Sequence, residues 1–252
     1  IKFVSLPPLG GKSILSKLKL IANAPKVISL VSAVIKRSDI FQLRAPTGIG
    51  VYLIPYLTWF IKAKGWYKYA GNWNQENPPL GYQLQRWMLK NQNRPVTING
   101  KWDDQPKQCL TFENPCLTKN DYKKGELIVK EKKYKAPWSF CFVGRIEKAK
   151  GVERIIYAFS GLNEENKNRI AQVNFVGDGN EMEYFKSLAI KSGVTMNFLG
   201  LLPRNVVFKL YEKSDFLLLP SDSEGFPKVI AEAMNFGCIP IVSNVSSIGQ
   251  YI

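Results

Sequence analysis

The sequence has 252 residues, of which 45% are hydrophobic and 22% are charged. These proportions are ordinary for a folded globular protein and exclude an intrinsically disordered chain, and the length suffices for one large core or two smaller ones. The formal net charge of +15 is unevenly distributed: residues 1–136 contain 23 Lys and Arg against 8 Asp and Glu, whereas residues 137–252 contain 12 of each kind. The asymmetry predicts two domains, 1–136 and 137–252.

The basic first half predicts an acidic partner: an anionic membrane surface, a phosphate-bearing acceptor or nucleic acid. A generally basic solvated surface would give the same excess of charge. No motif supports nucleic acid, because the sequence lacks zinc-finger spacing, an aromatic RNP-like strand and a homeodomain-like helix. Nucleic acid is therefore not an expected partner.

The sequence contains no histidine, which excludes catalysis by Ser-His-Asp or Cys-His groups. The four cysteines, at positions 109, 116, 141 and 238, have no spacing typical of a metal site, so no metal is expected. Cys141 and Cys238 lie in apolar, strand-like runs. They are predicted to be buried thiols of a reduced, cytoplasmic protein.

The first half has an irregular pattern. Strands are predicted at 1–6, 39–43 and 66–69, helices at 24–36, 49–62 and 82–90, and an extended segment at 95–99. The apolar run 48–61 is too short to span a membrane and fits either an interfacial helix or a buried core helix. The lysine-rich segment 122–137 has no clear periodicity and is predicted to be a linker.

The second half alternates apolar strands with amphipathic helices. Strands are predicted at 139–143, 172–176, 195–199, 216–219 and 239–242, and helices at 152–162, 181–192, 205–213 and 226–236. This alternation predicts a parallel α/β sheet covered on both faces. Ligands of such sheets bind beyond the carboxyl ends of the strands, where Gly144, Gly177 and Ser221 are placed.

Two glutamates frame the junction between a loop and a helix near the C-terminus. The first lies within Ser223-Glu224-Gly225-Phe226-Pro227, and Glu232 follows on the helix. Pro227 suits the first turn of a helix, where the free N–H groups attract anions. The junction is therefore a candidate site for an anionic ligand, with Glu224 in the loop and Glu232 on the helix wall.

Three motifs resemble those of family 4 glycosyltransferases, which are retaining enzymes of the GT-B fold. They are the run from Ser221 to Met234, Phe142-Val143-Gly144-Arg145 followed by Lys150-Gly151, and Phe175-Val176-Gly177-Asp178-Gly179. Their order and spacing resemble the family from about residue 139 to 242. The resemblance implies two Rossmann-like domains with parallel sheets that face each other across a cleft.

The resemblance also implies roles for individual residues. Arg145 and Lys150 would bind the diphosphate of a nucleotide-sugar donor, Glu224 the sugar hydroxyls, and Glu232 the ribose. The remaining donor-binding candidates are Gly144, Gly177, Asp178, Gly179, Gly225 and Phe226. The nucleotide-sugar is a substrate, so no cofactor is expected. The departing phosphate can accept the acceptor's proton, which makes the absence of histidine tolerable.

The acceptor side is less well defined. Many relatives have a histidine where this chain has Tyr69-Ala70-Gly71-Asn72-Trp73, which leaves Asn72 as a substitute candidate. Arg44 and Thr47, at a strand end, are further candidates. The resemblance implies that the first strands and the closing helices of the fold lie outside these 252 residues.

Two interpretations remain. The first is a retaining glycosyltransferase that acts on a glycan or lipid-linked acceptor at the cytoplasmic face of the membrane, in surface polysaccharide or glycolipid synthesis. The second is a catalytically silent, nucleotide-binding partner subunit of the same fold.

Overall fold

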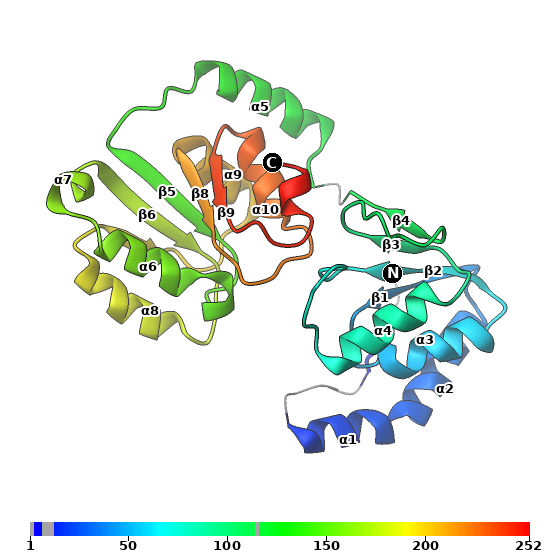
Figure 1. Cartoon of the computed structure of the whole chain (residues 1–252). Helices are drawn as coiled ribbons and strands as arrows, with labels where there is room; N and C mark the ends of the chain where they lie inside the picture. The colour runs from blue at the N-terminus through cyan, green and yellow to red at the C-terminus, as the bar shows by residue number, and fades with distance from the viewer. Residues whose placement is uncertain (1–2, 7–12, 114–115) are drawn as a thin grey trace. The chain divides into compact units, whose positions relative to one another are not determined.

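The computed structural model describes residues 3–6, 13–113 and 116–252, and it contains two compact units, Ile1–Glu113 and Asn114–Ile252 (Figure 1). The boundary lies earlier in the chain than the predicted division after residue 136. The difference arises because the predicted linker 122–137 is largely helical: α5 (Lys119–Glu131) packs on the second unit. Its first turn is fixed by a capping box between Thr118 and Asp121.

The described residues of the first unit form a parallel sheet of four strands in the order β1-β2-β3-β4. Figure 1 shows its helices on one side of the sheet, where Leu53, Ile54 and Tyr67 lie in the core. The strands are β1 (Ile40–Ala45), β2 (Lys64–Tyr69), β3 (Val96–Ile98) and β4 (Cys109–Thr111). The helices are α1 (Ile14–Ala22), α2 (Ala24–Ile35), α3 (Gly50–Trp59) and α4 (Leu80–Lys90).

From residue 116 onward, the second unit forms a parallel sheet of five strands in the order β7-β6-β5-β8-β9. The strands are β5 (Trp138–Val143), β6 (Ile170–Val176), β7 (Met196–Phe198), β8 (Phe216–Leu219) and β9 (Ile239–Val242). The helices are α6 (Val152–Ser160), α7 (Glu164–Lys167), α8 (Met182–Ala189), α9 (Arg204–Lys213) and α10 (Lys228–Asn235), with short 3-10 turns η1 (Lys148–Lys150), η2 (Ile190–Ser192) and η3 (Ile248–Gln250).

Helices cover both faces of the second sheet. In Figure 1, α6 and α8 lie on one face and α9 and α10 on the other. Phe140, Cys141 and Phe142 of β5 are consecutive and all buried, which is typical of a parallel strand enclosed on both faces. The same enclosure explains the continuous apolar run of β8, in which Leu217, Leu218 and Leu219 are also buried.

Most of the predicted elements are confirmed, with changes at their ends. The prediction of a strand at 1–6 is wrong for residues 3–6, which have no regular structure, and residues 1–2 lie outside the described part. Helices α1, α5 and α7 and strand β4 were not predicted. The apolar run 48–61 forms α3, whose side chains Leu53, Ile54 and Leu57 are buried, so it is a core helix.

No single helix in the described residues is long and apolar enough to cross a membrane. The pair α1 and α2, bent by 47°, has the length and composition of a span only when its two helices are taken together.

Candidate functional site

The second sheet has a topological switch point between β5 and β8. These two strands are neighbours, yet the chain continues from β5 to α6 on one face and from β8 to α10 on the other face. A crevice at the carboxyl ends of the strands is the expected ligand site of such a sheet. Two loops lie at this edge of the sheet, residues 144–151 and 220–227, and the Asp222 N–H donates to the Ala149 carbonyl over 2.9 Å.

The loops at this edge of the sheet approach each other closely at two glycines. Gly151 has φ +81°, and a Cβ there would overlap the carbonyl oxygen of Pro220. Gly177 has φ +139°, and a Cβ there would overlap the carbonyl oxygen of Gly144. Only glycine combines this backbone conformation with this proximity, so both glycines are required to bring the three loops together.

Lys150 and Glu224, which the sequence places 74 residues apart, form an ion pair across the switch point. The Lys150 Nζ lies 2.7 Å from Glu224 Oε1, and the side chains are 24% and 10% exposed. The two predicted site residues are thus in direct contact, in a partly enclosed position.

Arg145 also lies at this edge of the sheet, but its side chain is 76% exposed. Its Nη2 lies 3.1 Å from Glu147 Oε2, within the same loop. The guanidinium is therefore accessible to a ligand, and its pairing with Glu147 is open to solvent.

Arg154 on α6 fixes the loop that carries Glu224. Its Nε and Nη2 donate to the carbonyl of Pro220 over 3.0 and 2.6 Å, and its Nη1 lies 2.7 Å from Asp222 Oδ1. A bidentate contact of this kind restricts the start of the loop. This role was not predictable from the sequence, because Arg154 occupies an ordinary polar position of an amphipathic helix.

The same loop is supported from the C-terminal side. Ser247 Oγ donates to the Gly225 carbonyl over 3.2 Å, and the rings of Phe226 and Tyr251 pack edge to face at 4.9 Å. Helix α10 begins at Lys228, two residues after the predicted start, so Gly225 and Phe226 belong to the loop. Their backbone lies just before the N-terminus of α10.

Glu232 forms a separate cluster on the wall of α10. Its Oε1 accepts from Arg204 Nε over 3.4 Å, and Arg204 also contacts Asp121 and the Cys116 carbonyl. The Glu232 side chain is 13% exposed, and its burial raises the pKa of the carboxyl above the ordinary value. Glu224 and Glu232 thus each have their own cation.

The loop after β6 lies beside the loop after β5. The Gly144 N–H donates to Val176 O over 3.0 Å and the Ile146 N–H to Asp178 O over 2.9 Å. Asp178 is exposed, and its carboxylate accepts from the Gly179 N–H over 2.8 Å. The predicted residues Gly144, Gly177, Asp178 and Gly179 therefore lie in adjacent loops.

The acceptor-side candidates lie in the first unit, at the ends of β1 and β2. Arg44 is exposed on β1. Thr47 is held by the buried Gln85, which accepts from the Thr47 N–H over 3.1 Å and donates to its carbonyl over 2.9 Å. Asn72 Oδ1 accepts from the Asn74 N–H over 3.0 Å. Thr47 and Asn72 thus use polar atoms to shape their own loops.

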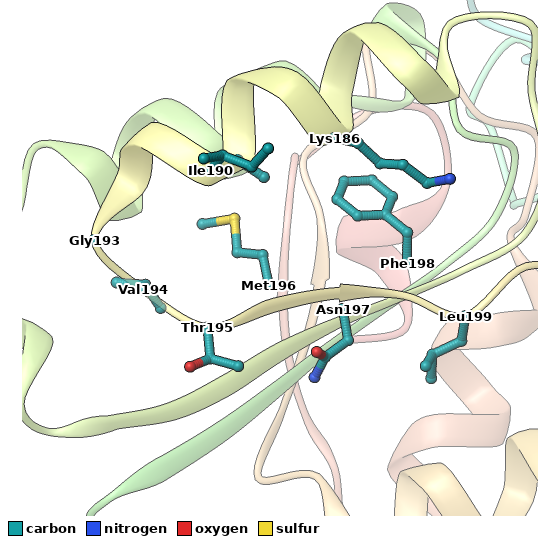
Figure 2. Close-up of a pocket in the computed structure, with 10 residues that line it drawn as sticks. Lys186, Ile190, Gly193, Val194, Thr195, Met196, Asn197, Phe198 and Leu199 are labelled. Carbon is teal, nitrogen blue, oxygen red and sulfur yellow. The ribbon is translucent and has the colours of Figure 1, made fainter.

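A groove of about 710 Å³ lies elsewhere in the second unit, between α8 and β7 (Figure 2). Figure 2 shows the side chains of Ile190, Met196 and Phe198 between these elements, and Lys186 beside them. The groove is at the far edge of the sheet from the switch point, and its lining has one charged side chain. Its chemistry suits an anion less well than the Lys150 region does.

The described residues contain no group of three His, Cys, Asp or Glu side chains that could hold a metal ion. Cys141 and Cys238 are buried, as predicted, with their sulfur atoms 3.8 Å apart.

Comparison with known proteins identifies the family. Residues 123–252 match the family described as Glycosyl transferases group 1. The chain belongs to this family. The match begins inside α5 and includes the switch-point loops and the pair of Arg204 with Glu232.

Two curated relatives show the extent of the similarity. An uncharacterized glycosyltransferase of Methanocaldococcus jannaschii is 33% identical over 113 residues, which are 44% of this chain and 28% of the relative. The lipopolysaccharide 1,6-galactosyltransferase of Salmonella typhimurium is 34% identical over 112 residues, 43% of this chain and 30% of the relative. The matched region thus spans less than a third of either relative.

The fold is shared with solved glycosyltransferases of the GT-B type. The crystal structure of HepE from Anabaena in complex with UDP superposes with a TM-score of 0.65 at 16% identity, over 90% of this chain and 65% of HepE. At this identity the likeness concerns the α/β fold with its parallel sheets.

The sequence analysis did not predict three residues that support the candidate site of this group 1 family member. Arg154, Arg204 and Ser247 each contact a predicted residue or its loop only because of tertiary packing. Nothing in their spacing distinguishes them from surface residues.

Proposed function

We propose that this chain is a retaining glycosyltransferase, which moves a sugar from a nucleotide-diphosphate donor to a glycan or lipid-linked acceptor. The observation that carries the proposal is the contact between Lys150 and Glu224 at the switch point of a group 1 family member. It places a cation suited to a diphosphate next to a carboxylate suited to sugar hydroxyls. The UDP complex of HepE, which has the same fold, supports a nucleotide-diphosphate ligand.

In the proposed complex, positive groups stabilise the charge that develops on the leaving diphosphate. Arg145 and Lys150 would bind phosphate oxygens, and the amides of Gly225 and Phe226 would add hydrogen bonds at the start of α10. The chain itself supplies this positive charge, so we expect transfer to persist after treatment with a metal chelator. Glu232 would bind the ribose, and Gly177, Asp178 and Gly179 would lie near the base.

Glu224 would hold the hydroxyls of the donor sugar while positive charge develops at the anomeric carbon. Retention of configuration would follow if the departing phosphate accepts the proton of the acceptor on the same face. On the acceptor side we propose roles for Arg44, Thr47 and Asn72. The similarity to a lipopolysaccharide galactosyltransferase supports a role in surface polysaccharide or glycolipid synthesis, at the cytoplasmic face of the membrane.

The direct test is a screen of nucleotide-sugars for nucleotide release by the full chain, followed by two substitutions. Glu224→Ala should mainly lower kcat, because the carboxylate acts on the sugar. Glu232→Ala should mainly weaken nucleotide binding, by about 1–3 kcal/mol, which is typical of a lost charged hydrogen bond. Glu183→Ala, which removes an exposed carboxylate of α8, is the control.

Wild-type kinetics in both Glu224→Ala and Glu232→Ala would show that the donor site has been misplaced. Tight nucleotide binding without transfer to any acceptor preparation would instead favour the catalytically silent subunit.

A further inference from the structure

Among the described residues, the two loops of the switch point form four ion pairs, which differ in their access to solvent. The pairs of Arg145 with Glu147, of Lys148 with Glu153 and of Arg154 with Asp222 each contain a side chain that is at least half exposed. In the fourth pair, both Lys150 and Glu224 are largely enclosed. The Lys150–Glu224 interaction is therefore the least screened of the four.

The enclosure makes separation of Lys150 from Glu224 costly. A carboxylate that is 10% exposed has little water available to replace the lysine, and an unpaired charge in such a position is strongly disfavoured. The Lys150 ammonium group, by contrast, would have a phosphate of the ligand as its new ion-pair partner. Any ligand that pairs with the Lys150 ammonium must therefore also donate hydrogen bonds to the Glu224 carboxylate.

We propose that Lys150 exchanges partners when the donor binds, and that Glu224 thereby makes the site select a nucleotide that carries a sugar over the free nucleotide. This inference rests on the proposed function. A nucleotide-sugar supplies hydroxyl donors for the Glu224 carboxylate as its diphosphate takes Lys150. A free nucleoside diphosphate also pairs with Lys150, but it leaves the Glu224 carboxylate without a hydrogen-bond donor. Glu224 therefore opposes the binding of the free nucleotide.

Arg145 does not impose the same cost. Its pair with Glu147 is exposed, so water can solvate Glu147 when the guanidinium turns to a phosphate. Glu224 and the ligand phosphate therefore compete only for Lys150. This competition disappears when Glu224 loses its charge while Lys150 remains.

The test measures the binding of UDP, GDP and ADP to the full chain by calorimetry, in the wild type and in variants at Lys150, Glu224 and Asp222. Glu224→Gln should bind the preferred nucleotide about tenfold more tightly than the wild type, which corresponds to a coupling of ordinary size between charges in contact. In the Lys150→Ala background, Glu224→Gln should change the affinity less than about twofold, because no lysine remains to be released.

Asp222→Asn is the matched control. It removes the same charge two residues away in the same loop, but its partner is Arg154 and its side chain is 57% exposed. We expect a change of less than about twofold. Thermal unfolding of each variant verifies the fold, and Glu224→Ser provides a second uncharged substitution if Glu224→Gln is unstable.

The outcomes separate the two proposals. Absence of binding of all three nucleotides, in the wild type and in Glu224→Gln alike, would overturn the donor site itself. Binding by the wild type with no tightening in Glu224→Gln and Glu224→Ser, or with equal tightening in Asp222→Asn, would overturn the partner exchange and leave the donor site intact.

Discussion

Gly151 connects the two loops of the switch point because it has no side chain. Its backbone has a positive φ, and the Pro220 carbonyl occupies the place of a Cβ. The contact brings the loop of Lys150 against the loop of Glu224, so a residue without chemistry of its own determines whether the ion pair forms. The two charged residues were recognisable in the sequence as parts of motifs, whereas their direct contact was not.

Gly151→Ala should lower the free energy of unfolding by at least ~2 kcal/mol, since it adds both backbone strain and a steric overlap. Thermal or urea unfolding measures the effect. Gly161→Ala is the control, because Gly161 has φ −78° and the nearest atom to an added Cβ is 3.5 Å away. Equal stability of the two variants would contradict the proposed need for glycine at position 151.

At the scale of elements, polar groups at the end of α5 help to attach this helix to the rest of the second unit. Lys132, just after the helix, is half-buried and donates to the carbonyls of Tyr211, Ser214 and Phe236 over 3.0, 2.6 and 3.2 Å. All three carbonyls lie at the C-terminal ends of α9 and α10, where the last backbone acceptors are not used by the regular hydrogen bonds of the helix. One lysine therefore joins three elements.

Lys132→Met should destabilise the second unit by about 2–4 kcal/mol, because it leaves three carbonyls without this donor. Lys133→Met, the adjacent exposed lysine, should change stability by less than ~0.5 kcal/mol. Urea unfolding of both variants checks the difference. A similar, small effect of both would mean that water replaces the Lys132 ammonium without cost.

The contrast between β8 and α5 shows what the sequence could predict. Strands β8 and β9 were predicted at their observed bounds, because both are continuous apolar runs. Enclosure explains the run of β8, in which Leu217, Leu218 and Leu219 are buried, whereas Ile239 and Ile241 of the edge strand β9 are exposed. Helix α5 was not predicted, because its buried residue is Gly125 and its attachment depends on Lys132. Hydrophobic periodicity carries no signal for contacts of this kind.

For the candidate site, the position of the motif residues was predictable from the sequence, but their contacts were not. The motif residues Arg145, Lys150 and Glu224 lie at the switch point, where their placement at strand ends predicted them. Their individual partners were not predictable, since Arg204 reaches Glu232 and Arg154 reaches Pro220 from helices that are distant in sequence. Such pairings depend on how the helices pack over the sheet.

For the molecule as a whole, the excess positive charge remains mainly in the first unit after the boundary is corrected. Residues 1–113 contain 16 Lys and Arg against 5 Asp and Glu, and residues 114–252 contain 19 against 15. Lys62 and Lys64 are exposed in the first unit, and Lys68 lies over the ring of Phe112 at 4.6 Å. We propose that this unit binds an anionic membrane surface.

The full chain should bind vesicles that contain acidic lipid, and the binding should fall as salt is added, because the attraction acts within about one Debye length. Replacing Lys62 and Lys64 with glutamine should weaken co-sedimentation, whereas the same change at Lys130 and Lys133 of the second unit should have a smaller effect. Equal partitioning onto neutral and acidic vesicles would refute the electrostatic contribution.

The central claim is that the switch point between β5 and β8 binds a nucleoside diphosphate. Backbone amide NMR of the full chain during titration with UDP, and with GDP and ADP in parallel, tests it most directly. We expect one of these nucleotides to shift the amides of residues 144–151 and 221–228, with smaller changes at 177–179. Shifts confined to the groove at 193–199, or no shifts with any of the three nucleotides, would contradict the account.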